Sequence, residues 1–230
     1  MVQTLITPKK MKQMAKTDIV FCIDISGSME PCIAGVKQNI HGFIDLIEKD
    51  PEVTIDWRLG FLAHISLGFF VREFTTDVQE FRRALDSLQT GGDEANLPAL
   101  DLCLDFPWRS DAHKFVIMFT DEGVATGWEP EQSRSKVDQL MKKIMDIGAS
   151  VYIIAIDAPE SDDYRRIATA NKCRFIGIPA SSNFKVVNFD EMLAKLGKSV
   201  STGSRGIVSS QQSVMNDLYG VKNFVCKINT

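Results

Sequence analysis

The stretch DIVFCIDISGSM, residues 18–29, decides the fold of this chain. Its first part, DIVFCID, is a short apolar run without polar alternation, which is typical of a strand buried on both faces of a sheet. The run ends at Asp24, and the hydroxyl residues Ser26 and Ser28 follow directly. The stretch therefore predicts a central strand whose carboxyl end carries oxygen-bearing side chains.

Outward from this strand, strand-like and helix-like segments alternate along the chain. Apolar residues at three- and four-residue spacing predict amphipathic helices, and short apolar runs predict buried strands. Further strands are expected over 54–64, 67–74, 114–120, 150–156 and 173–178. Helices are expected over 31–49, 78–88, 95–106, 131–147, 162–170 and 189–200. The link between the second and third strands is so short that it permits only an antiparallel pair.

This alternation predicts one α/β domain. We expect a doubly wound, mainly parallel six-stranded sheet with one antiparallel edge strand and helices on both faces, as in Rossmann-like folds. The expected domain covers residues 17–200 and follows an N-terminal tail over 1–16. Residues 201–230 begin with a stretch rich in Ser, Gly and Gln and are expected to form a linker or appendage.

Composition and charge exclude several classes of protein. The net charge is −4, so nothing global indicates binding to nucleic acid or to an anionic membrane. The five cysteines are widely spaced without a C-x-x-C pair, which argues against a disulfide framework or a zinc site and favours a reducing compartment. Neither a secretory signal nor an 18-residue apolar window is present, and we expect a cytoplasmic protein.

Three loops carry the residues that could bind a ligand or take part in a reaction. Asp24, Ser26 and Ser28 follow the first strand, Asp93 precedes a central helix, and Asp121 follows a later strand. The carboxyl ends of strands in an open α/β sheet converge on the crevice where ligands bind. Hard cations such as Mg²⁺ take oxygen ligands, so the sequence predicts a site for a divalent cation at this crevice.

The three loops, in this order and with a hairpin between the first two, resemble the metal-ion-dependent adhesion site of von Willebrand factor A domains. The resemblance rests on Asp-x-Ser-Gly-Ser-Met, Gly-Gly-Asp and Thr-Asp and covers roughly residues 17–200. It implies that Ser26 and Ser28 bind the metal directly, while Asp24 and Asp121 act mainly through water. The implied metal is Mg²⁺, with Mn²⁺ or Ca²⁺ as alternatives, and the implied function is protein binding, in which an acidic side chain of the partner completes the metal shell.

Two positions depart from the family pattern. Asp93 stands where the family usually has threonine, and Glu122 replaces the glycine that commonly follows Asp121. With Asp93 the site holds three carboxylates, which leaves a net charge of −1 around a divalent ion, and Glu94 adds to it. We hypothesise that this charge strengthens metal binding and weakens the capture of an acidic partner.

Function hypotheses from three classes remain open at the level of sequence. The first is a non-enzymatic intracellular scaffold, and the resemblance implies ATPases of the MoxR kind, chelatases, kinases or stress and conflict systems as associated proteins. The second is a Mg²⁺-dependent phosphatase-like or phospho-acceptor enzyme, because Asp24 lies at a strand tip, although Ser26 stands where the phosphatases need a second aspartate. The third is a metal-free structural module whose site has decayed.

Overall fold

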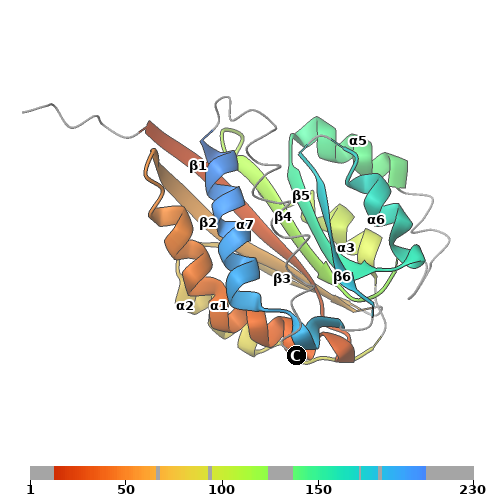
Figure 1. The fold of residues 1–230 in the computed structure, drawn as a ribbon. Helices are drawn as coiled ribbons and strands as arrows, with labels where there is room; N and C mark the ends of the chain where they lie inside the picture. The colour runs from red at the N-terminus through yellow and green to blue at the C-terminus, as the bar shows by residue number, and fades with distance from the viewer. Residues whose placement is uncertain are drawn as a thin grey trace, which may run out of the picture.

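The computed structural model describes residues 13–65, 68–92, 95–123, 137–170, 172–180 and 183–205. These residues contain one six-stranded sheet with the strand order β3-β2-β1-β4-β5-β6 (Figure 1). The strands are β1 (Gln13–Asp24), β2 (Val53–Ile65), β3 (Gly68–Thr75), β4 (His113–Thr120), β5 (Ser150–Asp157) and β6 (Arg174–Pro179). Neighbouring strands are parallel except β2 and β3, which are antiparallel. The predicted fold class is confirmed.

Helices cover both faces of the sheet. They are α1 (Glu30–Glu48), α2 (Val78–Asp86), α3 (Asn96–Cys103), α5 (Val137–Ile147), α6 (Asp162–Ile167) and α7 (Phe189–Ser204). Short 3₁₀ helices span Gly27–Met29, Pro159–Ser161 and Asn183–Val186. Figure 1 shows α1, α2 and α7 on one face and α3, α5 and α6 on the other. Each face has its own apolar core.

The central position of β1 follows from its apolar side chains. Phe21 points to the face of α1, where its ring packs against the rings of Phe43, Phe81 and Phe119 at centroid distances of 5.6, 5.6 and 6.3 Å. Its neighbour Cys22 is fully buried in the core on the opposite face. Both faces of the strand are therefore covered, as the absence of polar alternation predicts.

The strand order places a ligand crevice beside β1. β1 pairs in parallel with β2 on one side and with β4 on the other, and the chain winds outward from it in both directions. This is the point in an open α/β sheet where loops at the carboxyl ends of the strands diverge and leave room for a ligand. The loops that follow β1 and β4 flank it.

The two ends of the expected domain differ from the structure. β1 begins at Gln13, so the last part of the expected tail is strand and pairs with β2 from Val53 onward. The last helix, expected to end near Val200, continues to Ser204, within the expected linker. It continues because the Ser204 hydroxyl is buried and receives a hydrogen bond from the Thr17 hydroxyl at 2.7 Å.

Smaller differences concern element ends and undescribed segments. α6 ends at Ile167 instead of Ala170, and α3 covers only Asn96–Cys103 of the helix expected over 95–106. The first part of the helix expected over 131–147 lies outside the described residues, as does the turn expected between β2 and β3. The other predicted strands and helices are present with bounds shifted by one or two residues.

Two expectations from composition can be compared with the structure. The cysteines in its described part, Cys22, Cys32, Cys103 and Cys173, are buried, and none of them forms a disulfide with another of the four. Cys226 lies outside the described residues. No helix in the described ranges combines the length and the apolar character needed to cross a bilayer.

Candidate metal centre

Asp24 is the last residue of β1 and is fully buried. Its Oδ1 accepts a hydrogen bond from the Ser26 backbone N–H at 2.8 Å, and its Oδ2 accepts one from the Thr120 hydroxyl at 2.9 Å. The carboxylate thus joins the loop after β1 to the end of β4. Both oxygens are held in fixed positions, as hydrogen bonds to a charged acceptor are strong.

Backbone hydrogen bonds hold the loop after β1 from both sides. The Ile25 N–H donates to the carbonyl of His64 on β2 at 3.1 Å, and the Ile25 carbonyl accepts from the Gly91 N–H at 2.9 Å. Gly91 and Gly92 have φ angles of 152° and 79°, which residues with a Cβ rarely adopt. The Gly-Gly pair thus brings the third predicted loop beside the first.

The hydroxyl groups of this loop point toward the end of β4. The Oγ atoms of Ser26 and Ser28 lie 3.2 Å apart, and the Ser28 hydroxyl donates to Oδ1 of Asp121 at 3.1 Å. The structure therefore brings together Asp24, Ser26, Ser28 and Asp121, four of the five residues expected to form the site. Asp93, the fifth, lies outside the described residues.

Negative charge accumulates at this site. Burial raises the pKa of the Asp121 carboxyl, and the charges of Asp24 and Glu122 raise it further against the opposing hydrogen bond from Ser28. Burial also raises the pKa of the Cys32 thiol, again with a contribution from Asp24 and Asp121. Within the described ranges, no lysine or arginine forms an ion pair with either carboxylate of the site.

The donor set fits a hard divalent cation. Its described members are carboxylate and hydroxyl oxygens, which Mg²⁺ and Ca²⁺ prefer to nitrogen or sulfur. No cluster of three or more His, Cys, Asp or Glu side chains with metal-binding spacing occurs in the described part of the chain. The candidate site has two described carboxylates, Asp24 and Asp121, and its other described oxygen donors are serine hydroxyls.

Sequence reasoning missed the role of Thr120. Its hydroxyl donates to Asp24 and also accepts a hydrogen bond from the Glu122 backbone N–H at 3.2 Å. Thr120 therefore orients the buried carboxylate and shapes the turn that presents Asp121. Its place at the tip of β4, directly before a candidate ligand, was the available signal.

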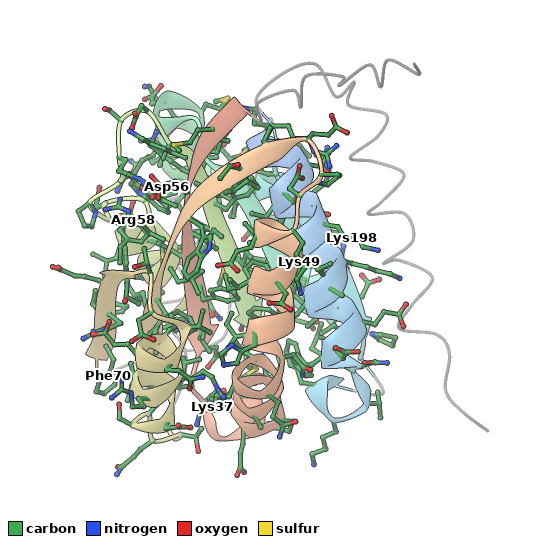
Figure 2. All side chains as sticks on the ribbon, turned by 90° about the vertical axis from the view of Figure 1, so that its left-hand side faces the viewer. Lys37, Lys49, Asp56, Arg58, Phe70 and Lys198 are labelled. Atoms are coloured by element: carbon green, nitrogen blue, oxygen red, sulfur yellow. The ribbon has the colours of Figure 1, made fainter. Side chains whose placement is uncertain are left out.

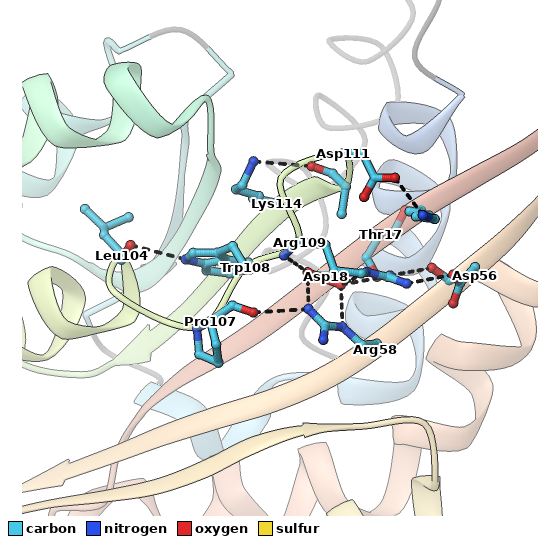
Figure 3. Close-up of polar contacts among 12 residues, drawn as sticks. Thr17, Asp18, Asp56, Arg58, Leu104, Pro107, Trp108, Arg109, Asp111 and Lys114 are labelled. Atoms are coloured by element: carbon cyan, nitrogen blue, oxygen red, sulfur yellow. Dashed lines mark hydrogen bonds and ion pairs between the residues drawn. The ribbon is translucent and has the colours of Figure 1, made fainter.

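A second polar cluster, beside the middle of β1, was also missed (Figure 3). Asp18 is fully buried and accepts hydrogen bonds from Arg58 Nε at 2.9 Å and from the backbone N and side-chain Nε of Arg109 at 2.8 and 2.9 Å. Arg109 also donates to Asp56 at 2.7 Å. The partners of Asp18 lie 40 and 91 positions away in the sequence, and no local motif connects them.

Comparison with known families gives one match over most of the chain. The model of the von Willebrand factor type A domain matches residues 18–196. No curated protein matches the chain.

Several solved structures share the fold at low sequence identity. The VWA domain of SpRpn10 is 17% identical with a TM-score of 0.57, and the match covers 84% of this chain and 99% of that one. The conserved hypothetical protein BatB from Bacteroides thetaiotaomicron is 15% identical with a TM-score of 0.57, over 82% and 99%. The open conformation of the pilus adhesin SpaC from Lactobacillus rhamnosus GG is 14% identical with a TM-score of 0.56, over 85% of this chain and 31% of the adhesin.

Proposed function

The chain belongs to the von Willebrand factor type A domain family, and we propose that it is a cytoplasmic protein-binding module that holds Mg²⁺ at the carboxyl end of β1. Domains of this family are generally protein-interaction modules. The proposed ligands and supporting residues are Asp24, Ser26, Ser28, Asp93 and Asp121, with Mn²⁺ or Ca²⁺ as alternative ions. The acidic side chain of a partner protein completes the metal shell.

One observation carries the proposal: the contiguous series of oxygen atoms from Ser26 Oγ to Ser28 Oγ to Asp121 Oδ1, with spacings of 3.2 and 3.1 Å. Ser28 is exposed and Asp121 is partly exposed, so a cation and a partner can reach these oxygens from solvent. The raised pKa of Asp121, caused by burial and by the charges of Asp24 and Glu122, reflects negative charge that a cation would offset.

Each residue has a separate task in this proposal. Ser26 and Ser28 would supply hydroxyl ligands that carry no charge, and this preserves the ability of the metal to attract a partner carboxylate. Asp24 and Asp121 would hold metal-bound water and orient the serine hydroxyls. When bound, Mg²⁺ supplies the positive charge that an acidic side chain recognises.

The environment of Asp24 argues against the phosphatase or phospho-acceptor alternative. A carboxylate that attacks phosphorus needs an accessible oxygen. Asp24 is fully buried, and both of its oxygens accept hydrogen bonds, from the Ser26 N–H and the Thr120 hydroxyl. We therefore propose a binding function without catalysis. From the family resemblance, the proposed associated protein is an ATPase, a kinase or a component of a stress or conflict system.

A pull-down of proteins from the native cell, performed with Mg²⁺ and with EDTA, tests the proposal. We expect a partner that is captured in Mg²⁺, lost in EDTA and lost with Ser26→Ala. Ser110→Ala is the matched control, because Ser110 is an exposed serine in the loop before β4 and should leave capture unchanged. A partner that remains bound in EDTA and to Ser26→Ala would contradict the metal-dependent function and favour a metal-free structural module.

A further inference from the structure

The edge strand β3 exposes three consecutive apolar side chains. Phe69, Phe70 and Val71 are 41%, 49% and 56% exposed. β3 is the first strand in the sheet order, and among the described strands only β2 pairs with it. Figure 2 shows Phe70 on this strand at the rim of the molecule. A row of unpaired backbone groups flanked by apolar side chains is a template for pairing with another strand.

The exposed side chains lie on both faces of the sheet. Phe69 and Val71 are opposite His64 and Leu62 of β2, and Leu62 packs in the core beneath α3. Phe70 is opposite Ala63, which belongs to the core on the other face. A partner helix on one face could cover only part of this patch. A strand placed along the edge of β3 covers both faces, because its side chains alternate in the same way.

We propose that β3 pairs antiparallel with β3 of a second copy of this chain, so that the two sheets join across a two-fold axis beside Phe70. Symmetric interfaces bring the same patch of each subunit together. In this register Phe70 lies opposite Phe70 of the second copy, and Phe69 lies opposite Val71 of the second copy. Every exposed apolar residue of the patch then meets an apolar residue.

Polarity disfavours the registers that shift the pair toward Glu73. A shift of one step in that direction places Phe70 opposite Arg72 and Phe69 opposite Glu73. Further shifts place Arg72 opposite Arg72, or Glu73 opposite Glu73, and like charges directly opposite each other destabilise a strand pair. A shift of one step in the opposite direction places Phe70 opposite Gly68, which has no side chain to pack against the ring. In the proposed register Arg72 lies opposite Gly68, where it keeps its ion pair with Glu80 of its own subunit.

The oligomeric state in solution is the first test. Light scattering coupled to size-exclusion chromatography should show a monomer that converts to a dimer as the protein concentration rises, because the contact is small. Phe70→Glu places two carboxylates opposite each other at the axis and should leave only monomer. Met145→Glu is the matched control, because Met145 is 56% exposed on α5 and its substitution should not change the dimer.

Single cysteines test the register. Opposite residues in an antiparallel pair have Cα atoms about 4.5 to 5.5 Å apart, within the range that a disulfide spans. Under mild oxidation with copper phenanthroline, Phe70→Cys should cross-link to itself. Phe69→Cys and Val71→Cys should cross-link rapidly only when the two variants are mixed, since each alone places its thiols diagonally, beyond the roughly 7 Å limit on Cα separation.

Two outcomes would overturn the proposal. The first is a wild-type protein that stays monomeric at every concentration and a Phe70→Cys variant that cross-links no faster than Met145→Cys. The second is a dimer that Phe70→Glu leaves intact, which would place the interface elsewhere. Circular dichroism of each variant confirms that the fold is retained, as expected for substitutions of exposed side chains. Neither outcome bears on the metal-dependent function, because β3 contributes no residue to the proposed metal site.

Discussion

Two buried aspartates on β1 have opposite electrostatic environments. Asp18 and Asp24 are both fully buried, in the middle and at the carboxyl end of the same strand. Asp18 forms ion pairs with Arg58 and Arg109. Asp24 accepts hydrogen bonds from an N–H and a hydroxyl, neither of which carries a charge. Burial of a carboxylate without a cation is costly, and at Asp24 a divalent ion would supply the missing charge.

Asp18→Asn should destabilise the protein strongly. The substitution leaves the guanidinium groups of Arg58 and Arg109 without their buried counter-charge. Loss of one partner of a buried ion pair typically costs 3 to 5 kcal/mol, and we expect about 3 kcal/mol because the two arginines are partly exposed. Urea unfolding at pH 7 measures the loss. Asp56→Asn is the control and should cost less, because Asp56 is 40% exposed and, in the described part of the chain, its ion pair is with Arg109 alone.

The effect of Asp18→Asn should depend on pH. Burial alone raises the pKa of Asp18, but hydrogen bonds and positive charge from Arg58 and Arg109 outweigh it and lower the pKa below its ordinary value. A lowered folded-state pKa contributes stability that is present above the unfolded-state pKa, about 3.9, and is lost as the pH falls through the folded-state value. The difference between wild type and variant should therefore shrink below about pH 4. A difference that stays constant from pH 7 to pH 2 would show that the carboxylate charge contributes nothing.

Asp93→Thr should weaken Mg²⁺ binding. Asp93 adds a third carboxylate to the proposed site, and opposite charge nearby strengthens cation binding. Calorimetric titration of Mg²⁺ into wild type and variant measures the change. Equal or tighter binding by the variant would contradict the hypothesis. Capture of an acidic partner should change in the opposite sense once both proteins are saturated with metal.

At the scale of elements, the close approach of α7 to α1 depends on Gly197. A Cβ atom at this position would lie 2.9 Å from the carbonyl oxygen of Phe43 and 3.3 Å from Cβ of Leu46. Gly42, on the same helix as Phe43, has no atom within 4 Å of the equivalent position. The two glycines therefore differ in role: Gly197 permits the close approach of α7 to α1, whereas helix packing does not require a glycine at position 42.

Gly197→Ala should force the two helices apart and destabilise the protein by about 1 to 3 kcal/mol, the usual cost of overpacking. Gly42→Ala should instead stabilise it by about 0.5 to 1 kcal/mol, because alanine restricts the unfolded chain and favours the helix. Thermal and urea unfolding of the two variants measure both effects. An increase in stability with Gly197→Ala would show that α7 moves away from α1 at little cost.

Most elements were predictable from apolar periodicity, while their ends were not. The strand β1 was found from its apolar run, but its start at Gln13 depends on pairing with β2, which adds backbone hydrogen bonds to a polar stretch. The end of α7 depends on Ser201 and Ser204, which are buried because they bond to Asp50 and Thr17. From local composition alone, both ends are predicted to be tail or linker, because the residues that stabilise them are distant in sequence.

At the scale of the whole molecule, the proposed metal site couples ion binding to folding. An ion that binds only the folded state stabilises it by mass action, by about 2.7 kcal/mol at a concentration 100 times the dissociation constant. The melting temperature should therefore rise with Mg²⁺ and fall with EDTA. Ser28→Ala should remove most of this dependence, and Ser110→Ala should retain it. A melting temperature that does not depend on Mg²⁺ would favour a metal-free module.

The proximity of the described candidate residues was predictable as far as these residues form local motifs. Asp24, Ser26 and Ser28 are adjacent in the sequence, and Asp121 follows a strand whose place in the sheet could be inferred. The contacts that fix their geometry were not predictable, because Thr120 reaches Asp24 across 96 positions of sequence. The contacts of Arg58 and Arg109 with Asp18 were not predictable for the same reason, because these arginines are 40 and 91 positions away in the sequence.

The contact between Thr17 and Ser204 has a practical consequence for engineering. It places the start of the buried part of β1 beside the end of α7, with the two hydroxyl oxygens 2.7 Å apart. Asp24 lies about 20 Å farther along β1, at the carboxyl end of the strand. Domains whose entry and exit points are adjacent tolerate insertion into host proteins. A fluorescent protein or a surface tether joined at this end would leave the loops of the proposed metal site unobstructed, so the proposed Mg²⁺ binding could be used in a metal-gated sensor.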